Sequence, residues 1–409
     1  MQRSGGAAIL MQQDSKLKFL VGDRVVLEAM QSLRPLPVFA GEAVSFLERL
    51  SEILLASREA KVFSDLMTFA FWCRRANIRQ MAEAYQEVGL RLGRGVTFHI
   101  APSNVAMNFA YSFAAALLAG NASVVRLPSR QFPQVEILCR VMRDILQEDL
   151  PGLRPYVCFV QYGHEKEIND ELSLLADTRI IWGGDRTIET IRRSPLQPRA
   201  NEITFADRFS LLVIRAEAYL QAGDRERIAQ DFYNDTYLTD QNACTSPRLI
   251  VWLGEGIQEA QEVFWQSQQS FLQQKRYNLS PVQAIDKLDR FCCLAAGQET
   301  QLVRGEDNTI VRGRVKDLSV SLIEHMGHSG YFLEYEAKEL AEILPLCQEK
   351  RCQTLSYFGM EKEELASFIR SSCPRGIDRM VPMGRTMDFR LVWDGVDLIR
   401  AMSRAVMVG

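Results

Sequence analysis

The sequence predicts an α/β protein whose main domain is a parallel β-sheet with helices on both faces. The chain has 409 residues, of which 47% are hydrophobic and 24% charged, as in globular proteins large enough for more than one core. Strand-like apolar runs alternate with helical patterns from residue 96 to residue 214. Because the alternation resumes at residue 249, a second α/β domain is expected from about residue 223.

Helices are expected before the first strand and between the strands that follow it. Residues 43–90 carry apolar side chains at helical spacing, and Gly93 and Gly95 end this pattern. The expected strands are 96–101, 123–127, 156–160, 178–182 and 209–214. The expected intervening helices are 104–119, which ends at Gly120-Asn121, then 133–147, 165–175 and a short one after Gly183-Gly184-Asp185. Strict alternation implies right-handed crossovers and a parallel sheet.

The second domain is expected to begin with a helix at 224–238. A polar loop, TDQNACTSPR (239–248), leads into a strand at 249–253 and a helix at 256–274. The tail DFRLVWDGVDLIRAMSR (388–404) is strand-like and then helical, and its Asp394-Gly395 pair is typical of a turn.

Charge and hydropathy exclude several classes of function. The chain has 48 basic and 51 acidic residues, a net charge of −3, and no long run of one sign, which argues against a nucleic-acid or anionic-membrane surface. No segment approaches the ~18 consecutive apolar residues of a transmembrane helix. Residues 1–19 lack the long apolar core of a secretory signal, so we expect a cytoplasmic protein.

The cysteines do not form a metal or disulfide pattern. Their number is odd and no C-x-x-C pair occurs, so neither a disulfide framework nor a metal site is expected. Most should be small buried hydrophobic residues, including Cys292-Cys293 in the apolar context FCCLAA.

Cys244 differs from the other cysteines because it lies in a polar loop, beside Gln241, Asn242, Thr245 and Ser246. A thiolate is a strong nucleophile and a good leaving group, which suits acyl transfer. Local composition leaves two interpretations open, a catalytic nucleophile or an inert loop cysteine.

The loops after the strands of the first domain are the expected ligand site, because ligands of such sheets lie beyond the carboxyl ends of the strands. These loops contain APSN (101–104), PSR (128–130) and GGD (183–185). The glycine-rich G-x-G-x-x-G pattern is absent, so the stretch alone is consistent with a plain strand–helix–strand unit.

Several of these motifs together resemble the aldehyde dehydrogenase superfamily. Asn104, Ala119-Gly120-Asn121 and VRLPSR (125–130) follow the order of that superfamily's P-W-N-F, A-A-G-N and V-x-K-P-S-E motifs. IIWGGD (180–185) falls where the superfamily has its F-T-G-S turn, and DQNAC (240–244) falls where it has G-Q-x-C.

A closer resemblance is to the LuxC-type acyl-CoA reductases, over nearly the whole chain from about residue 20. It is carried by the APSN segment and by FAFWCRRANI (69–78), WGGD (182–185), QNACTSPR (241–248), TLSYFG (354–359) and GIDRMVPMGRTMDFRLVWDG (376–395). The resemblance implies an aldehyde dehydrogenase-like fold, with a Rossmann-type cofactor domain, an α/β catalytic domain and a small oligomerisation element. The expected domains are 1–222 with the cofactor site, 223–378 with the nucleophile, and 379–409, which returns to the cofactor domain and the oligomer interface.

The resemblance also implies an activity, the reduction of acyl-CoA or another acyl carrier to a fatty aldehyde. Cys244 takes the nucleophile position, and Asn104 takes the position whose amide binds the oxyanion together with the Cys244 N–H. The residues expected to bind the cofactor are Pro102, Ser103, Arg126, Ser129, Arg130, Gly183 and Gly184.

Two departures from the superfamily refine this expectation. Phe205, in FADRFS, stands where oxidising members have a general-base glutamate. Arg130 replaces a glutamate that would bond the ribose 2′-hydroxyl, and Leu127 replaces a lysine. Since an arginine suits a 2′-phosphate, NADPH is the expected cofactor.

Other residues have weaker assignments. His328, in GHS (327–329), lines the site or protonates a leaving thiolate, or is a solvent-facing or supporting residue. Glu334 is a candidate contact of the nicotinamide ribose, and His99 is expected in the core. The resemblance and the apolar FRLVW (389–393) favour a homo-oligomer whose C-terminal strand caps a neighbour's sheet edge, and an acyl-activating synthetase as partner. Two alternatives remain: an acylating aldehyde dehydrogenase working oxidatively, and a non-catalytic partner of an acyl-transfer complex.

Overall fold

The computed structural model describes residues 16–86, 89–102 and 105–409, which form two compact units. The first unit contains Met1–Ala206 and Leu391–Gly409, and the second contains Asp207–Arg390. These boundaries differ from the expected 222 and 378. The main reason is the strand at 209–214, which was assigned to the first sheet but belongs to the sheet of the second unit. A buried apolar strand looks the same in sequence whichever sheet it joins.

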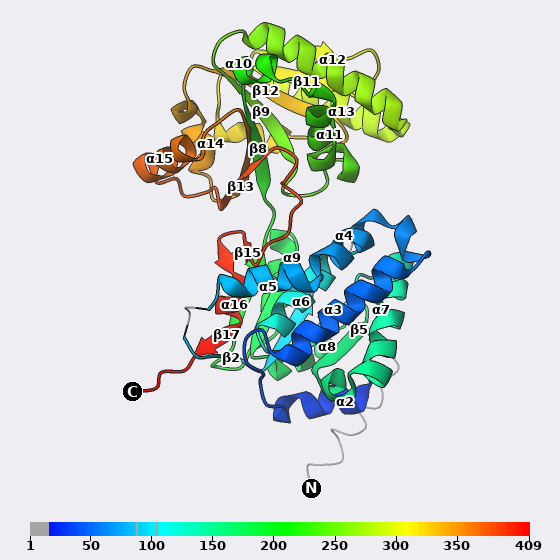
Figure 1. Ribbon diagram of the computed structural model, residues 1–409. Helices are drawn as coiled ribbons and strands as arrows, with labels where there is room; N and C mark the ends of the chain where they lie inside the picture. The colour runs from blue at the N-terminus through cyan, green and yellow to red at the C-terminus, as the bar shows by residue number, and fades with distance from the viewer. Residues whose placement is uncertain (1–15, 87–88, 103–104) are drawn as a thin grey trace. The chain divides into compact units, whose positions relative to one another are not determined.

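The first unit is built on a six-stranded sheet with the strand order β1-β5-β4-β3-β6-β7. Figure 1 labels β5 of this sheet together with the helices of the same unit. The strands are β1 Lys18–Val21, β3 Val96–Ile100, β4 Ala122–Arg126, β5 Val157–Gln161, β6 Thr178–Trp182 and β7 Asn201–Phe205. Neighbours from β5 to β7 are parallel, and β1 joins the edge antiparallel to β5. The parallel sheet is therefore confirmed, with β1 and β7 as strands that the sequence pattern did not reveal.

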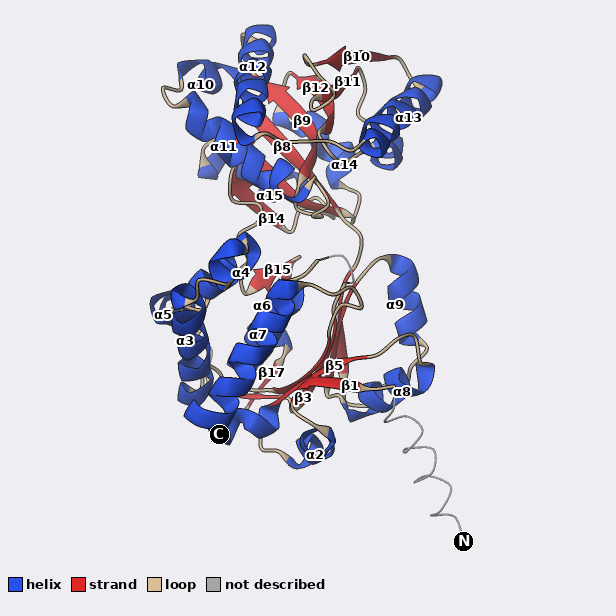
Figure 2. Ribbon diagram, turned by 90° about the vertical axis from the view of Figure 1, so that its right-hand side faces the viewer, coloured by secondary structure: helices blue, strands red, loops and turns tan. Residues whose placement is uncertain are grey.

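Helices cover both faces of this sheet. They are α2 Arg24–Ala29, α3 Gly41–Ala56, α4 Ser64–Trp72, α5 Arg75–Glu83, α6 Asn108–Leu118, α7 Pro133–Asp144, α8 Lys166–Leu175 and α9 Asp185–Arg192. Figure 2 shows α6 and α7 on one face and α8 and α9 on the other. The Ala-rich α6 is almost wholly buried, because small side chains let it lie under α3 and against the sheet.

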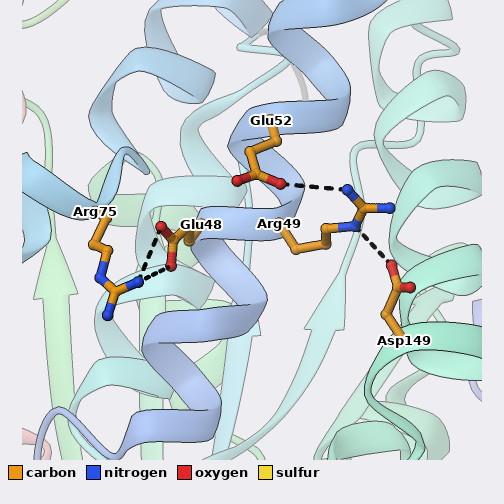
Figure 3. A network of polar contacts seen from close by, with 5 residues as sticks. All are labelled: Glu48, Arg49, Glu52, Arg75 and Asp149. Carbon is orange, nitrogen blue, oxygen red and sulfur yellow. Dashed lines mark hydrogen bonds and ion pairs between the residues drawn. The ribbon is translucent and has the colours of Figure 1, made fainter.

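The side of α3 that faces away from the core carries a charged network (Figure 3). Arg49 donates to Asp149 at 2.8 Å and to Glu52 at 3.3 Å, and Arg75 on α5 pairs with Glu48 at 3.3 Å. These exposed pairs orient α3 towards its neighbours but contribute little stability, since water screens them.

The C-terminal segment belongs to the first unit. Its elements are β15 Val392–Trp393, β16 Val396–Asp397, α16 Leu398–Ala401 and β17 Ser403–Ala405. Asp394 and Gly395 both have positive φ, 48° and 72°, so they form the expected turn between β15 and β16. β17 pairs antiparallel with β2 (Arg91–Gly93) of its own chain.

The second unit is built on a seven-stranded sheet with the order β10-β11-β12-β9-β8-β13-β14, parallel except for the β10–β11 pair. The strands are β8 Phe209–Arg215, β9 Pro247–Leu253, β10 Thr300–Arg304, β11 Val311–Val315, β12 Tyr331–Ala337, β13 Cys352–Phe358 and β14 Arg379–Pro382. Alternate side chains of β8 enter different cores, Leu211 and Val213 on one face and Leu212 and Ile214 on the other.

Helices again cover both faces. They are α10 Ala216–Gln221, α11 Arg225–Asp235, α12 Ile257–Lys275, α13 Pro281–Gly297, α14 Leu344–Cys347 and α15 Lys362–Ser372. α10, α11 and α12 pack on one core, and α13, α14 and α15 on the other. Cys292 and Cys293 are exposed on α13, so the expectation that they lie in the core is wrong. This helix turns only a narrow stripe inward, with Lys287 and Leu294 its buried residues.

The helices of the described residues include none that is both long and apolar enough to cross a membrane.

Candidate active site

The loop that carries Cys244 makes a strained turn between α11 and β9. Asp240 and Gln241 have left-handed backbones, with φ of 51° and 56°, a conformation that costs a non-glycine residue about 1 kcal/mol or more. The turn is held at both residues: the Tyr277 hydroxyl donates to the Asp240 carboxylate at 2.6 Å, and the Gln241 N–H donates to the Thr236 carbonyl at 2.8 Å. The surrounding structure therefore fixes the backbone immediately before Cys244.

Gln241 joins this loop to the neighbouring strand β12. Its side chain is fully buried, its Nε2 donates to the carbonyl oxygens of Pro247 (3.1 Å) and Tyr331 (3.4 Å), and its Oε1 accepts from the Gly330 N–H (2.7 Å). A buried amide satisfied in this way specifies one arrangement of the loop.

Two basic side chains converge on the carbonyl oxygen of Gln241. Nδ1 of His328 lies 2.9 Å from it, and Nη2 of Arg248 donates to it at 3.4 Å. Because a carbonyl oxygen only accepts, the proton of a neutral His328 ring is on Nδ1, and Nε2 keeps its lone pair.

The position of His328 depends on a second strained turn. Ser329 and Gly330 have φ of 58° and 85°, and a Cβ on Gly330 would collide with the carbonyl oxygen of Thr309. Lys287 reaches the same turn from α13 and donates to the Ser329 carbonyl at 2.7 Å. The GHS segment is therefore a rigid support, which local sequence composition did not reveal.

The charges of this cluster favour a neutral imidazole beside a buried cation. Burial lowers the pKa of His328, and the positive charge of Arg248 lowers it further. Burial also lowers the pKa of Arg248, whereas the charges of Asp207 and of an ionised Cys244 raise it. Arg248 remains a cation at neutral pH, because guanidinium groups do not deprotonate in proteins.

Cys244 lies partly exposed at the end of the loop, and its carbonyl oxygen accepts a hydrogen bond of 2.8 Å from the Ser210 hydroxyl on β8. Since attraction between two charges is mutual, Arg248 stabilises negative charge on the Cys244 sulfur. The structure thus places His328 and Arg248 around the loop of the predicted nucleophile. Arg248 lies in the QNACTSPR motif, and its role was not predicted from the sequence.

Glu334 lies away from solvent, in the core of the second unit. Its carboxylate accepts hydrogen bonds from Trp252 (3.0 Å), Trp265 (2.7 Å) and Arg312 (3.1 Å), and only 1% of its surface is exposed. These contacts make it a structural group of the core and offer no oxygen to a ribose.

The first unit has the switch point at which ligands of open parallel sheets bind. β4 and β5 follow β3 on one side, whereas β6 and β7 lie on its other side. Pro102 follows β3, and Gly183 and Gly184 follow β6, so these expected cofactor residues flank the switch point. Ser103 and Asn104 lie outside the described residues.

The glycines after β6 form a close turn. The Gly183 N–H donates to the Phe205 carbonyl at 3.1 Å, and a Cβ on Gly183 would crowd Thr187 at 3.1 Å. Gly184 is the N-cap residue of α9 and provides no side-chain cap, and a Cβ on it would meet no atom within 4 Å. Bare backbone at a helix start of this kind is suited to the phosphates of a dinucleotide.

The residues after β4 divide into two groups. Arg126 donates to the Gly163 carbonyl and lies 4.5 Å from the centre of the Tyr162 ring, so it shapes the neighbouring loop. Ser129 and Arg130 are exposed, with the Arg130 guanidinium 5.3 Å from the centre of the Phe132 ring. An exposed guanidinium beside a hydroxyl fits a ribose 2′-phosphate.

His99 lies in the core, as expected. It is fully buried, with its ring nitrogens 2.8 Å from the Ser112 hydroxyl and 3.3 Å from the Ser123 hydroxyl, and burial lowers its pKa to about 3. Phe205 is also buried, stacked on Trp182 with 3.8 Å between ring centres.

Comparison with known proteins agrees with the motifs. The family model described as acyl-CoA reductase (LuxC) matches residues 42–405. A long-chain acyl-protein thioester reductase of Aliivibrio fischeri is 21% identical over 302 residues, which is 73% of this chain and 60% of that relative. The chain thus spans less than two thirds of the relative's length.

Solved structures show the same fold. An indole-3-acetaldehyde dehydrogenase complexed with NAD⁺ superposes with a TM-score of 0.64 at 12% identity, covering 93% of this chain and 86% of the other. A glyceraldehyde-3-phosphate dehydrogenase of Methanocaldococcus jannaschii complexed with NADP gives 0.63 at 11% identity, covering 93% and 91%. The predicted aldehyde dehydrogenase-like fold is therefore confirmed.

Proposed function

Because the chain belongs to the acyl-CoA reductase (LuxC) family, we propose that it reduces a fatty acyl thioester, carried by coenzyme A or a protein, to an aldehyde. The reductant is NADPH, and the reaction passes through an acyl-enzyme on Cys244. The observation that carries the proposal is the convergence of His328 and Arg248 on the Gln241 carbonyl, three residues before Cys244.

The first step is transfer of the acyl group to the enzyme. The Cys244 sulfur attacks the thioester carbonyl carbon, a C–S bond to the enzyme forms, the C–S bond to the carrier breaks, and the carrier leaves as a thiol. Arg248 stabilises the attacking thiolate. The lone pair on His328 Nε2 takes the thiol proton and returns it to the leaving thiolate. The resemblance assigns the oxyanion to the Cys244 N–H and to Asn104, which lies outside the described residues.

The first unit would hold the cofactor. Gly184, at the start of α9, would receive its phosphates in the turn that Gly183 shapes. Ser129 and Arg130 would receive its 2′-phosphate, and the reduced nicotinamide would supply a hydride to the acyl carbon. The C–S bond to Cys244 then breaks, which releases aldehyde and restores the thiolate. The balanced reaction consumes one NADPH and one proton for each aldehyde and carrier thiol released.

A mass-spectrometric experiment tests the proposal. Mixing the protein with a long-chain acyl-CoA in the absence of cofactor should add one acyl group to the peptide containing Cys244, and subsequent NADPH should remove it with loss of NADPH absorbance. Cys244→Ala should abolish both signals, whereas Cys373→Ala, which removes an exposed cysteine, should change neither. Acylation that persists in Cys244→Ala would refute the assignment.

Rate measurements in both directions, together with the acylation experiment, separate the alternatives. An enzyme that works mainly in the oxidative direction would convert aldehyde, NADP⁺ and coenzyme A to acyl-CoA faster than it reduces acyl-CoA. A non-catalytic partner would show no acylation and no turnover. Homo-oligomerisation and docking to an acyl-activating synthetase belong to the proposal as well, and light scattering at micromolar concentration, with and without the synthetase, tests them.

A further inference from the structure

Asp235, the last residue of α11, has a buried carboxylate. Its side chain is 1% exposed, Oδ2 accepts from the Gly384 N–H at 2.6 Å, and Oδ1 accepts from the Thr386 N–H at 3.0 Å. Both donors belong to one segment, residues 384–388, called the 384–388 loop below. One carboxylate therefore holds a loop that lies about 150 residues further along the chain.

A positively charged side chain also binds the 384–388 loop. Arg379 on β14 donates to the carbonyl oxygens of Thr386 (3.2 Å), Arg385 (3.3 Å) and Asp388 (3.3 Å). The Asp235 carboxylate thus binds N–H groups of the loop, and the Arg379 guanidinium binds its carbonyl oxygens. Five backbone hydrogen bonds to two charged side chains fix a loop that has no strand or helix of its own.

Glycine is required where the loop meets α11. Gly384 has φ of 87°, and a Cβ on it would lie 2.7 Å from the Asp231 carboxylate. The close approach of the loop backbone to α11, which the short bond to Asp235 needs, is possible only without a side chain at this position.

The 384–388 loop contacts the loop of the nucleophile. The Thr245 hydroxyl, on the residue after Cys244, lies 3.4 Å from the Met387 sulfur. The nucleophile loop is itself bonded to the residue next to Asp235, since the Thr236 carbonyl accepts from the Gln241 N–H at 2.8 Å. Two consecutive residues at the end of α11 therefore hold the two loops that meet at Thr245 and Met387.

We propose that Asp235 is a positioning residue of the active site, which fixes the 384–388 loop against the nucleophile loop and makes Met387 a wall for the acyl thioester bound at Cys244. The inference rests on the proposed function. Met387 is suited to this place, because its flexible, polarisable side chain adapts to an acyl chain.

Burial and hydrogen bonding act in opposite directions on the ionisation of Asp235. Burial raises its pKa to about 6, although hydrogen bonds from Gly384 and Thr386 lower it. Ionising a group that is buried to this degree costs stability, and the N–H donors of Gly384 and Thr386 offset part of that cost, since an apolar side chain would leave them unpaired. The charged groups that face it are Asp231 on its own helix, with Arg227 and Arg385 near Asp231, and Arg379 beyond the loop.

The test compares Asp235→Asn with Glu226→Gln, which makes the same change from acid to amide at an exposed residue of α11. Asp235→Asn replaces one acceptor oxygen by an amide donor, so one loop bond is lost. We expect the KM for long-chain acyl-CoA to rise on the order of tenfold, the effect of one charge-assisted hydrogen bond, with a smaller change in kcat. In the unmodified protein this KM should fall as pH rises through about 6, where Asp235 ionises, and in Asp235→Asn it should be flat.

Hydrogen exchange gives a readout that does not depend on activity. Amides of both 241–246 and 384–388 should exchange faster in Asp235→Asn, and both should keep their rates in Glu226→Gln. Faster exchange in 384–388 alone, or an unchanged KM and pH profile, would overturn the proposal. If the unmodified protein does not reduce acyl-CoA, the proposed function fails, while unchanged exchange in 241–246 would separately overturn the role of Asp235.

Discussion

The carbonyl oxygen of Gln241 lies 2.9 Å from Nδ1 of His328, and this contact determines which ring nitrogen carries the proton. The imidazole points its donor at the nucleophile loop and keeps Nε2 available as a base. Because Gln241 is buried and held by its own side chain, the acceptor cannot move away from His328. The strained turn before Cys244 therefore serves to orient a histidine as well as to present a thiol.

His328→Gln tests this arrangement. The glutamine amide can donate to the Gln241 carbonyl, but it cannot take a proton, so the loop should stay in place while acylation of Cys244 slows by about 10²–10⁴-fold. Rapid-quench measurement of acyl-enzyme formation gives the rate, and circular dichroism checks the fold. An acylation rate equal to that of the unmodified protein would show that His328 only supports the loop.

The pH dependence of the acylation rate follows from the same contact. Burial and Arg248 lower the pKa of His328, so the ring stays neutral down to a more acidic pH than an exposed histidine, whose pKa is about 6.5. The pH at which half of the rate is lost through His328 should therefore lie below 6.5. His328→Gln should lack this acidic limb; an identical limb in the variant would assign it to another group.

Arg248 should activate the sulfur through its charge. Arg248→Met keeps much of the side-chain volume but removes the cation, so less of Cys244 is thiolate at neutral pH. Alkylation of Cys244 by iodoacetamide at pH 7 should slow on the order of tenfold, and Arg248→Lys should recover part of the rate. The exposed Cys373 is alkylated in the same experiment and serves as the internal reference. Equal slowing at both cysteines would point to a general change in the protein.

Arg130 should select the cofactor. Its exposed guanidinium can make a charge-assisted hydrogen bond to a 2′-phosphate, so Arg130→Glu should raise the KM for NADPH by repulsion and improve the use of NADH. Arg58→Glu, which changes an exposed arginine after α3, is the control for net charge. Steady-state kinetics with both cofactors measures the effect, and an equal loss with NADPH and NADH would show that Arg130 does not contact the phosphate.

Much of the fold could be predicted because it depends on local pattern. The strands from β3 to β6, and the helices between them, follow directly from apolar periodicity and from terminators such as Gly120. The edge strand β7, NEITF, was missed because edge strands carry polar side chains. β8 was placed in the wrong sheet because an apolar pattern does not identify the strands that lie beside it.

The candidate site was less predictable, because it depends on contacts between distant residues. Cys244 stood out by its polar surroundings, but the role of Arg248 depends on His328, which lies 80 residues further along the chain and meets it at the Gln241 carbonyl. Asp235 gave no local signal at all, since an aspartate at a helix end is usually exposed. Its function is visible only once the 384–388 loop is in place.

The last prediction concerns the fate of the acyl-enzyme. The resemblance to the aldehyde dehydrogenases places Phe205 where oxidising members have a glutamate that activates water, and phenylalanine cannot accept a proton. The acyl-enzyme should therefore hydrolyse slowly, over many turnover times, and aldehyde with NADP⁺ should give little free acid unless coenzyme A is added. Phe205 is buried against Trp182, so Phe205→Glu would place an unpaired carboxylate in the core and is a poor test.

Phe205→Leu is the better variant, because it keeps an apolar side chain and removes the stacked ring. If the absence of a base is what protects the thioester, hydrolysis of the isolated acyl-enzyme should stay slow in Phe205→Leu. If the ring itself excludes water, hydrolysis should become faster, and acid formation from aldehyde and NADP⁺ should rise with it. Mass spectrometry of the acylated Cys244 peptide over time distinguishes the two. Rapid release of free acid by the unmodified protein, with no coenzyme A present, would mean that another group activates water and that the protein is an oxidising enzyme.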